Sequence, residues 1–334
     1  MQNRLKNICN HLFTKLNLHP VLVDVGASGE PPKIWDSIAS HSIYVGFDPD
    51  LREMINVSQK FYKSTVINSI VTEDSLAKET SFYFTKFPYC SSALKPNLKS
   101  LSHFLFSDLF TVEKEAKIST TSLGSVIDQL SLPGIDWLKT DSQGMDLRIF
   151  TGLKEELRSK ILAIDVEPGL IDAYEGEDLF VDAHKRLIQE GFWLSTLNIG
   201  DVVRMKQSSL AYLLKAKNGI KKNLIEQTLK KTPAWCEARY LRTVESLVQN
   251  NLNKNGFVLL WIFSVLDNQL GFGLDLVLEY KKIFGPDDTF EFMFEETTKS
   301  IHLSQQKTFL GLMKSILPIS LKSWLKSSSF KVSP

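Results

Sequence analysis

The segment VDVGASG, residues 23–29, combines an acid with two glycines in what reads as a tight turn. Gly26 and Gly29 lack a Cβ atom, so the backbone can approach a ligand closely there. A helix after such a turn offers free N–H groups. The spacing is not GxGxxG, which argues against a dinucleotide pyrophosphate. With Asp24 before the turn and Ser28 within it, the segment suits a ligand with a cationic amino group, such as S-adenosylmethionine.

A second acid, Asp48 in GFDPD (residues 46–50), closes the next apolar run. An acid about 20 residues beyond a glycine turn can accept hydrogen bonds from two ribose hydroxyls. Pro49 ends the run and favours Asp48 for this role, while Asp50 suits a helix cap. The alternatives are a glycine turn without a ligand and an Asp48 that serves only the turn. The predicted cofactor-binding residues are Asp24, Gly26, Ser28, Gly29 and Asp48.

Two more carboxylates, Asp141 and Glu167, also follow apolar runs. In an open parallel sheet, the ligand crevice lies beyond the carboxyl ends of the strands. Four acids at one edge are costly unless a cation or a polar ligand balances them. We predict Asp141 as a catalytic general base, with Glu167 as the second candidate. The alternatives are that both acids cap the helices that follow, or that they hold a divalent metal, which the sequence permits without requiring.

Polar residues near these acids are candidates for contacts to a substrate. Ser91 and Ser92 lie in a long Ser-, Asn- and Pro-rich segment, and Gln143 follows Asp141 by two residues. We predict these three as substrate-binding residues. The alternative for the two serines is an ordinary serine-rich turn.

Alternating strands and helices must position these residues. Short apolar runs predict strands at 21–26, 42–50, 65–71, 135–141 and 160–168, with an extra strand at 80–86 and late strands at 191–198 and 211–217. Helices are predicted at 3–17, 31–40, 51–57, 122–131, 144–158 and 178–190, and a loop with helical pieces at 87–115. This alternation predicts a mostly parallel α/β sheet with helices on both faces.

The character of the sequence changes after residue 221. We predict a catalytic domain over 1–221, with an N-terminal helix within 1–18, and a helical C-terminal region without strands over 222–334. Residues 297–334 hold six Lys and no Asp or Glu. Apolar residues at helical spacing from Phe309 to Leu317, and again from Leu321 to Leu325, suggest a peripheral contact with an anionic membrane. The alternative is a helix packed on the catalytic domain.

Composition narrows the partners and the compartment. The net charge is +1, and no base-reading motif is present, so we expect no nucleic-acid partner. The three cysteines have no CxxC spacing, which favours a reducing cytoplasm, with the membrane contact at its inner face. The longest apolar stretch, residues 256–266, is too short to span a bilayer.

Several motifs in the same order resemble the FkbM-type methyltransferase family. They are VDVGASG, GFDPD, CSSALKPN (residues 90–97), IDWLKTDSQGMDLRIFTGL (135–153) and AIDVEPGLIDAYEGEDLF (163–180). The resemblance covers about residues 20–200. It implies a class I, Rossmann-like methyltransferase fold, S-adenosylmethionine as cofactor, and O-methylation of a saccharide or a related small-molecule metabolite. The family commonly has Glu-Gly-x-Glu where this chain has Gln143-Gly144-Met145-Asp146.

The departure at Gln143 leaves an alternative open, because an amide cannot act as a base. A non-catalytic module that kept the S-adenosylmethionine fold is the runner-up hypothesis. A nicotinamide oxidoreductase is disfavoured by the glycine spacing.

Overall fold

The computed structural model describes residues 2–50, 52, 56–73 and 78–316. The chain divides into two compact units, Met1–Asp267 and Asn268–Pro334. The predicted division at 221/222 falls inside the first unit. Its helices and short 3₁₀ turns (η) are α1 (Gln2–Leu16), η1 (Lys33–Ser37), η2 (Ala39–His41), η4 (Pro88–Cys90), α2 (Leu98–Leu101), η5 (Leu105–Phe110), α3 (Leu123–Gln129), α4 (Asp146–Thr151), α5 (Glu155–Arg158), α6 (Phe180–Gln189), α7 (Gln207–Ala216), α8 (Lys222–Thr228), α9 (Val244–Gln249) and α10 (Lys254–Leu266).

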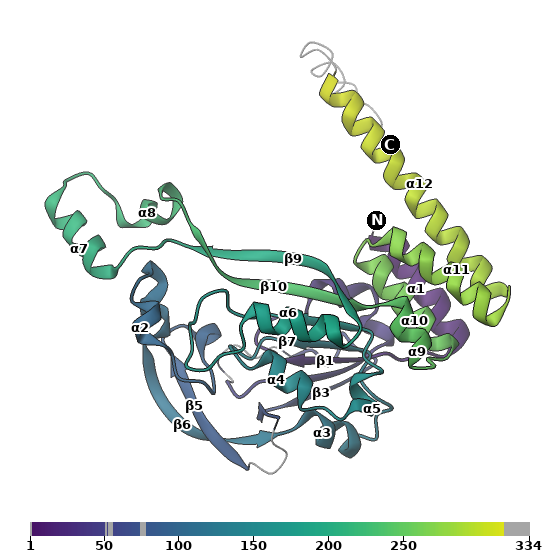
Figure 1. The fold of residues 1–334 in the computed structure, drawn as a ribbon, viewed down its shortest axis with the longest axis horizontal. Helices are drawn as coiled ribbons and strands as arrows, with labels where there is room; N and C mark the ends of the chain where they lie inside the picture. The colour runs from purple at the N-terminus through teal and green to yellow at the C-terminus, as the bar shows by residue number, and fades with distance from the viewer. Residues whose placement is uncertain (1, 51, 53–55, 74–77, 317–334) are drawn as a thin grey trace. The chain divides into compact units, whose positions relative to one another are not determined.

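A seven-stranded sheet forms the centre of the first unit, in the order β3-β2-β1-β7-β8-β10-β9 (Figure 1). All neighbours pair in parallel except β10, which runs antiparallel between β8 and β9. The predicted α/β fold with a mostly parallel sheet is therefore confirmed. The strands are β1 (Val21–Val25), β2 (Ile43–Phe47), β3 (Lys63–Ile67), β7 (Trp137–Thr140), β8 (Ala163–Val166), β9 (Phe192–Val202) and β10 (Thr232–Arg242).

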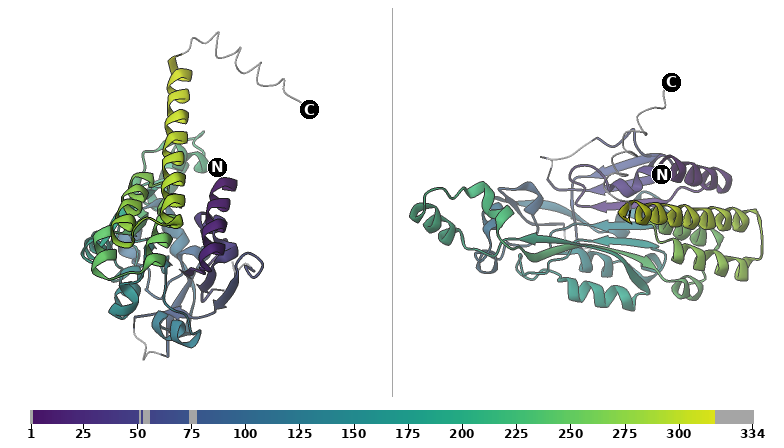
Figure 2. Two further views of the ribbon diagram at one scale, coloured as in Figure 1. Left: turned by 90° about the vertical axis from the view of Figure 1, so that its right-hand side faces the viewer. Right: turned by 90° about the horizontal axis from the view of Figure 1, so that it is seen from above.

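The two faces of the sheet are covered by different helices (Figure 2). On one face Val23, Leu138 and Ile164 are buried in a core that includes residues of α4 and α6. On the other face, Trp137 packs edge-on against Trp35, and its ring also contacts Phe263 of α10. Since side chains alternate along a strand, this double burial explains why the central strands read as nearly continuous apolar runs.

A small second sheet follows β3 and stands beside the main one. It contains β4 (Ile70–Val71), β6 (Val112–Thr121) and β5 (Glu79–Thr85), in that order. The predicted strand over 65–71 is thus two strands in different sheets. Strand β6 occupies the end of a segment predicted as a loop with helical pieces, because its alternation of charged and small residues gives little apolar signal.

Two predictions about the late part of the chain are wrong. Residues 211–217 lie mostly in α7, since Ala, Leu and Lys favour helices and Leu210 packs in a small core with Ile225 of α8. The region after 221 does contain a strand, β10, which fills the antiparallel position in the main sheet.

The helix predicted over 31–40, early in the chain, consists of the 3₁₀ turns η1 and η2.

The second unit is helical, as predicted for the C-terminal region. It holds α11 (Leu270–Phe284) and α12 (Asp288–Ile316), which pack against each other. The apolar positions from Leu317 to Leu325 lie outside the described residues. Of the helices that the structure describes, none has the length and apolar character needed to cross a bilayer.

A row of alternating charges crosses the main sheet in register. Asp24 of β1 pairs with Lys139 of β7, Lys139 with Asp165 of β8, and Asp165 with Arg239 of β10. The Lys139 Nζ atom lies 3.0 Å from a carboxylate oxygen of Asp24, and Arg239 lies 2.8 Å from Asp165. Each buried acid therefore faces a cation on the next strand, which offsets the cost of removing both charges from water.

Replacement of Lys139 by Met should unbalance this row. We expect Lys139→Met to lower the free energy of unfolding by about 3–5 kcal/mol, because it leaves the buried Asp24 without its cation. Adding Asp24→Asn should recover much of the loss. Urea denaturation of the single and double variants measures both effects, with the exposed Lys160→Met as a control expected within about 0.5 kcal/mol of wild type. Equal stability of Lys139→Met and wild type would show that the pair does not support the fold.

Candidate functional site

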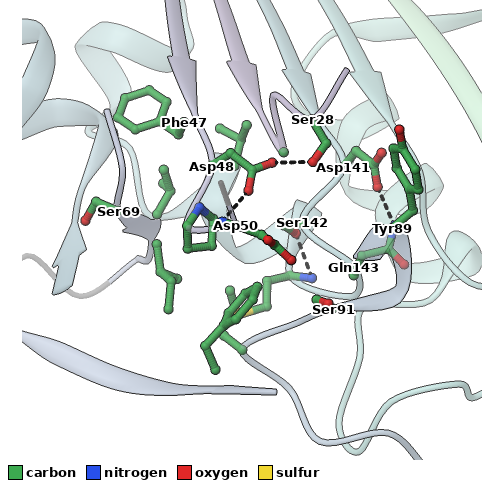
Figure 3. Close-up of a pocket in the computed structure, with 18 of the residues that line it drawn as sticks. Ser28, Phe47, Asp48, Asp50, Ser69, Tyr89, Ser91, Asp141, Ser142 and Gln143 are labelled. Carbon is green, nitrogen blue, oxygen red and sulfur yellow. Dashed lines mark hydrogen bonds between the residues drawn. The ribbon is translucent and has the colours of Figure 1, made fainter. Parts of the chain in front are cut away.

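A pocket lies at the carboxyl ends of β1, β2 and β7, and we call it the cofactor pocket (Figure 3). Of the predicted cofactor and catalytic residues, it brings together Gly26, Ser28, Asp48 and Asp141. Among the predicted substrate residues, Ser91 and Gln143 also line it. Its apolar wall consists of Val25, Phe47, Ile70, Val71, Phe82, Ala93 and Met145.

Gly26 shapes the turn after β1. Its φ of +79° favours glycine, and a Cβ atom there would lie 2.1 Å from the carbonyl oxygen of Asp141. The backbone N–H groups of Gly26 and Ala27 both donate to the carbonyl of Phe47, at 2.9 Å. The turn is thereby tied to the ends of β2 and β7. Gly29, with a φ of +73°, does not line the pocket, although a side chain there would contact the Tyr89 hydroxyl.

Asp48 is nearly buried, yet its carboxylate reaches the pocket (Figure 3). It accepts hydrogen bonds from the Ser28 hydroxyl, at 2.9 Å, and from the backbone N–H of Asp50, at 2.7 Å. Burial raises the pKa of Asp48 to about 6, against the opposing effect of these two bonds. A partly buried carboxylate held by two donors, with lone pairs left over, suits a ligand that brings hydroxyl donors.

Asp24 has a different place from the predicted one. It does not line the cofactor pocket; its side chain is buried, with one oxygen near Lys139 and the other accepting from the Tyr44 hydroxyl at 3.0 Å. Lys139 also donates to the carbonyl of Gly26, at 3.0 Å. Asp24 already faces a cation of the protein, so the structure gives it a positioning role behind the glycine turn.

Gln143 holds Asp141 through a short network. Its amide nitrogen donates to a carboxylate oxygen of Asp141 at 2.5 Å, and its amide oxygen accepts from the Tyr174 hydroxyl at 2.9 Å. The Gln143 carbonyl accepts from the Ser92 hydroxyl at 2.7 Å. Ser92 is buried and does not line the pocket, so it supports Gln143 and is not placed to touch a ligand.

Asp146, at the start of α4, joins the ends of β7 and β8. Its carboxylate accepts from the Ser142 N–H at 2.9 Å, from the Ser142 hydroxyl at 2.5 Å, and from the Glu167 N–H at 2.8 Å. Burial, and next the charge of Asp141, raise the pKa of Glu167 well above its ordinary value. Glu167 is thus held in place by its backbone, with a side chain that favours the protonated form.

Ser91 faces the cofactor pocket but is engaged within the protein. Its hydroxyl oxygen accepts from the Thr85 N–H at 3.0 Å and from Arg52 at 3.2 Å. Arg52 also forms an ion pair with Asp50, so the expected cap residue Asp50 is tied to this arginine. Ser91 therefore fixes the pocket wall.

Two further pockets meet the first around Tyr89, which lines all three. The polar pocket is lined by Asp141, Glu167 and residues of the charge row. The apolar pocket is lined by Gln143, Glu167 and a group of aromatic side chains. That group comprises Phe87, Tyr89, Phe106, Phe110, Tyr174 and Trp235. Asp141 is thus the carboxylate shared by the cofactor pocket and the polar pocket.

Sequence reasoning missed Lys139, Asp146 and Tyr174. Lys139 carried a usable signal, because a charged residue inside the buried run WLKT requires a counter-charge on a neighbouring strand. Asp146 could have been recognised as an acid in the first turn of a helix. Tyr174 contacts Gln143 across 31 residues of sequence and carried no local signal.

The site combines the carboxylates of Asp48 and Asp141 with the tight backbone turn at Gly26. In the part of the chain that the structure describes, no group of three or more His, Cys, Asp or Glu side chains is arranged to hold a metal ion. The residues present fit a nucleoside ligand, since Asp48 offers its carboxylate beside an apolar wall. Asp141 then stands where a proton could be taken from a hydroxyl in the polar pocket.

Comparison with known proteins agrees with this geometry at the level of the family. A search of curated proteins finds no significant match. The crystal structure of magnesium protoporphyrin IX methyltransferase from Synechocystis PCC 6803, with bound S-adenosylmethionine, is similar at 10% sequence identity and a TM-score of 0.27. That similarity covers 72% of this chain and 79% of the other. The sequence profile of the methyltransferase FkbM domain matches residues 25–194, from the end of β1 into β9. This match spans more than half of the sequence and contains Gly26, Asp48, Asp141 and Glu167. The chain belongs to the FkbM family of S-adenosylmethionine-dependent methyltransferases.

Proposed function

We propose that this methyltransferase acts on a hydroxyl group of a saccharide or a related small polar metabolite, with Asp141 as the general base. The observation that carries the proposal is the position of Asp141, which lines both the cofactor pocket and the polar pocket. A group that removes a proton during methyl transfer must reach the acceptor oxygen while that oxygen faces the donor. Asp141 is the carboxylate common to the two spaces.

The polar pocket suits an acceptor with several hydroxyls. Its walls carry carboxylates, an amide and a guanidinium, supplied by Glu167, Glu237, Asn198 and Arg239. Such side chains can donate to or accept from sugar hydroxyls. This chemistry supports a saccharide over an acceptor without polar groups.

In the proposed reaction each of these residues has a separate role. S-adenosylmethionine supplies an electrophilic methyl group. Ser28 and Asp48 would help to hold this cofactor in the cofactor pocket. Asp141 would orient the acceptor hydroxyl and take its proton, and Gln143 fixes the Asp141 carboxylate while it does so. Positioning of this kind can supply about 7–11 kcal/mol of the barrier, and a base a further ~10²–10⁴-fold. Glu167, which favours the protonated form, would donate a hydrogen bond to the acceptor.

The non-catalytic alternative rests on Gln143, and the geometry weakens that argument. The Gln143 amide nitrogen donates a hydrogen bond to the Asp141 carboxylate at 2.5 Å. In this positioning role the side chain of Gln143 does not need to act as a base. The cytoplasm remains our proposed location, supported by three free, buried cysteines. The peripheral membrane contact through residues 297–334 likewise remains a proposal, which rests on their six lysines.

Asp48→Asn should weaken cofactor binding and, at high pH, stabilise the ligand-free fold. Loss of the charged acceptor should weaken S-adenosylmethionine binding by at least ~1.5 kcal/mol in calorimetry. Because burial raises the pKa of Asp48 from 3.8 to about 6, the ionised side chain destabilises the ligand-free fold above pH 6. The variant should therefore be more stable than wild type at pH 8, by up to ~3 kcal/mol, and the gain should shrink as the pH falls from about 6 and vanish below about pH 3, where Asp48 is protonated in both states. Unchanged affinity would falsify the ribose assignment.

Asp141→Asn should remove the base and leave the pocket intact. We expect kcat to fall ~10²-fold or more, with S-adenosylmethionine affinity within a few-fold of wild type, in an assay that follows radiolabelled methyl transfer to a panel of saccharides. Glu167→Gln is the matched control and should cost less than about tenfold, because Gln preserves a hydrogen-bond donor. The opposite ranking would assign the base to Glu167. Loss of activity on addition of a chelator would favour the metal alternative over the simple base.

A further inference from the structure

The connection between β9 and β10, residues 203–231, carries an unusual concentration of positive charge. We call it the β9–β10 insertion; it contains α7 and α8, beyond the end of the long β9 and β10 strands (Figure 1). It holds eight basic residues and one acid, Glu226, in a chain whose net charge is only +1. All eight are exposed: Arg204, Lys206, Lys215, Lys217, Lys221, Lys222, Lys230 and Lys231.

Within the described part of the chain, most of this charge has no counter-charge. Lys231 lies 3.1 Å from a carboxylate oxygen of Asp201. In the described residues, the other seven cations of the insertion form no ion pair. Arg204 stacks over the Phe104 ring, which leaves its charge in place. A field of this density attracts an anionic surface.

Exposed apolar side chains stand among these cations. The insertion has its own small core, in which Leu210 of α7 and Ile225 of α8 are buried with Val203 and Leu105. Tyr212 and Leu224 are outside that core, 77% and 43% exposed. Tyr212 lies three residues before Lys215 in α7, so these two side chains share a side of that helix. Leu224 lies in the first turn of α8, close in sequence to Lys221 and Lys222.

We propose that the β9–β10 insertion docks this enzyme on an anionic lipid bilayer. Lysines next to an amphipathic tyrosine and a leucine are the combination that binds at the headgroup boundary, where charge meets lipid phosphate and the apolar groups enter the interface. A nucleic acid would use the charge but would leave Leu224 exposed to water. This surface is separate from the tail at residues 297–334, and it does not depend on the identity of the methyl acceptor.

The start of the insertion, at Val203, lies near the apolar pocket. The Leu105 N–H donates to the carbonyl of Val203, the first residue of the insertion, at 3.1 Å. Phe106, which follows Leu105, and Trp235, four residues after the insertion, both line the apolar pocket. Docking would therefore hold the apolar pocket close to the bilayer.

The test is co-sedimentation of the full-length protein with vesicles of phosphatidylcholine mixed with phosphatidylglycerol, at low and high salt. The insertion variant carries Lys215→Gln, Lys217→Gln, Lys221→Gln and Lys222→Gln. The control variant removes the same charge at exposed lysines elsewhere, by Lys33→Gln, Lys154→Gln, Lys160→Gln and Lys185→Gln. Wild type should bind, and the insertion variant should bind ~100-fold or more weakly, since each lysine near such a surface strengthens binding about fivefold. The control should match wild type.

A second variant tests the apolar contribution. Tyr212→Ser with Leu224→Ser should weaken vesicle binding about tenfold, while binding to a duplex DNA, which depends on the positive charge, should be unchanged. Matching thermal unfolding curves for all variants would show that the fold is kept. The proposal is overturned if wild type ignores anionic vesicles, or if the insertion and control variants weaken equally. It is also overturned if the insertion variant binds as wild type, in which case the tail carries any membrane contact, or if the serine variant retains full vesicle binding.

Discussion

The buried ion pair between Asp24 and Lys139 connects the two strands on which the site is built. Strand β1 supplies the glycine turn and β7 supplies Asp141, and Lys139 reaches both, at 3.0 Å from the Gly26 carbonyl and 3.8 Å from a carboxylate oxygen of Asp141. Burial by itself lowers the pKa of Lys139, but the charges of Asp24 and Asp141 raise it by a larger amount. The net shift is upward, so the side chain stays cationic. This fixed charge lets several carboxylates share one sheet edge without a bound ligand.

Gln143 solves a related problem on the other side of Asp141. A glutamate there, as the family commonly has, would place a second carboxylate 2.5 Å from the first, and two such groups can stay close only by sharing a proton. The amide removes that requirement, because it donates to Asp141 and accepts from Tyr174 at the same time. Its φ of +56° is strained for a residue with a side chain, and the Ser92 hydroxyl helps to hold it. The departure from the family pattern is therefore compatible with an organised base.

The sequence predicted what depends on local pattern and missed what depends on strand order. Apolar runs located β1, β2, β7 and β8, and the rule that ligands bind beyond the carboxyl ends brought Asp48 and Asp141 to one pocket. Strand β10 was missed, because TPAWCEARYLR has a proline at its second position and mixes polar with apolar residues. The role of Asp24 was missed for a different reason. Its partner Lys139 is 115 residues away, and the two meet only because β7 lies next to β1.

The arrangement of the three pockets bears on the proposed acceptor. With Asp141 as the proposed base, the reacting hydroxyl would lie near Asp141, which borders the polar pocket, so the part of the acceptor that reacts would be polar. Tyr89 and Glu167 border both the polar and the apolar pocket, so a non-reacting part of the same molecule could lie against Phe106 and Trp235. An acceptor that joins a saccharide to an apolar group would use both spaces. Such molecules concentrate at membranes, and the apolar pocket adjoins the base of the insertion that carries the positive charge.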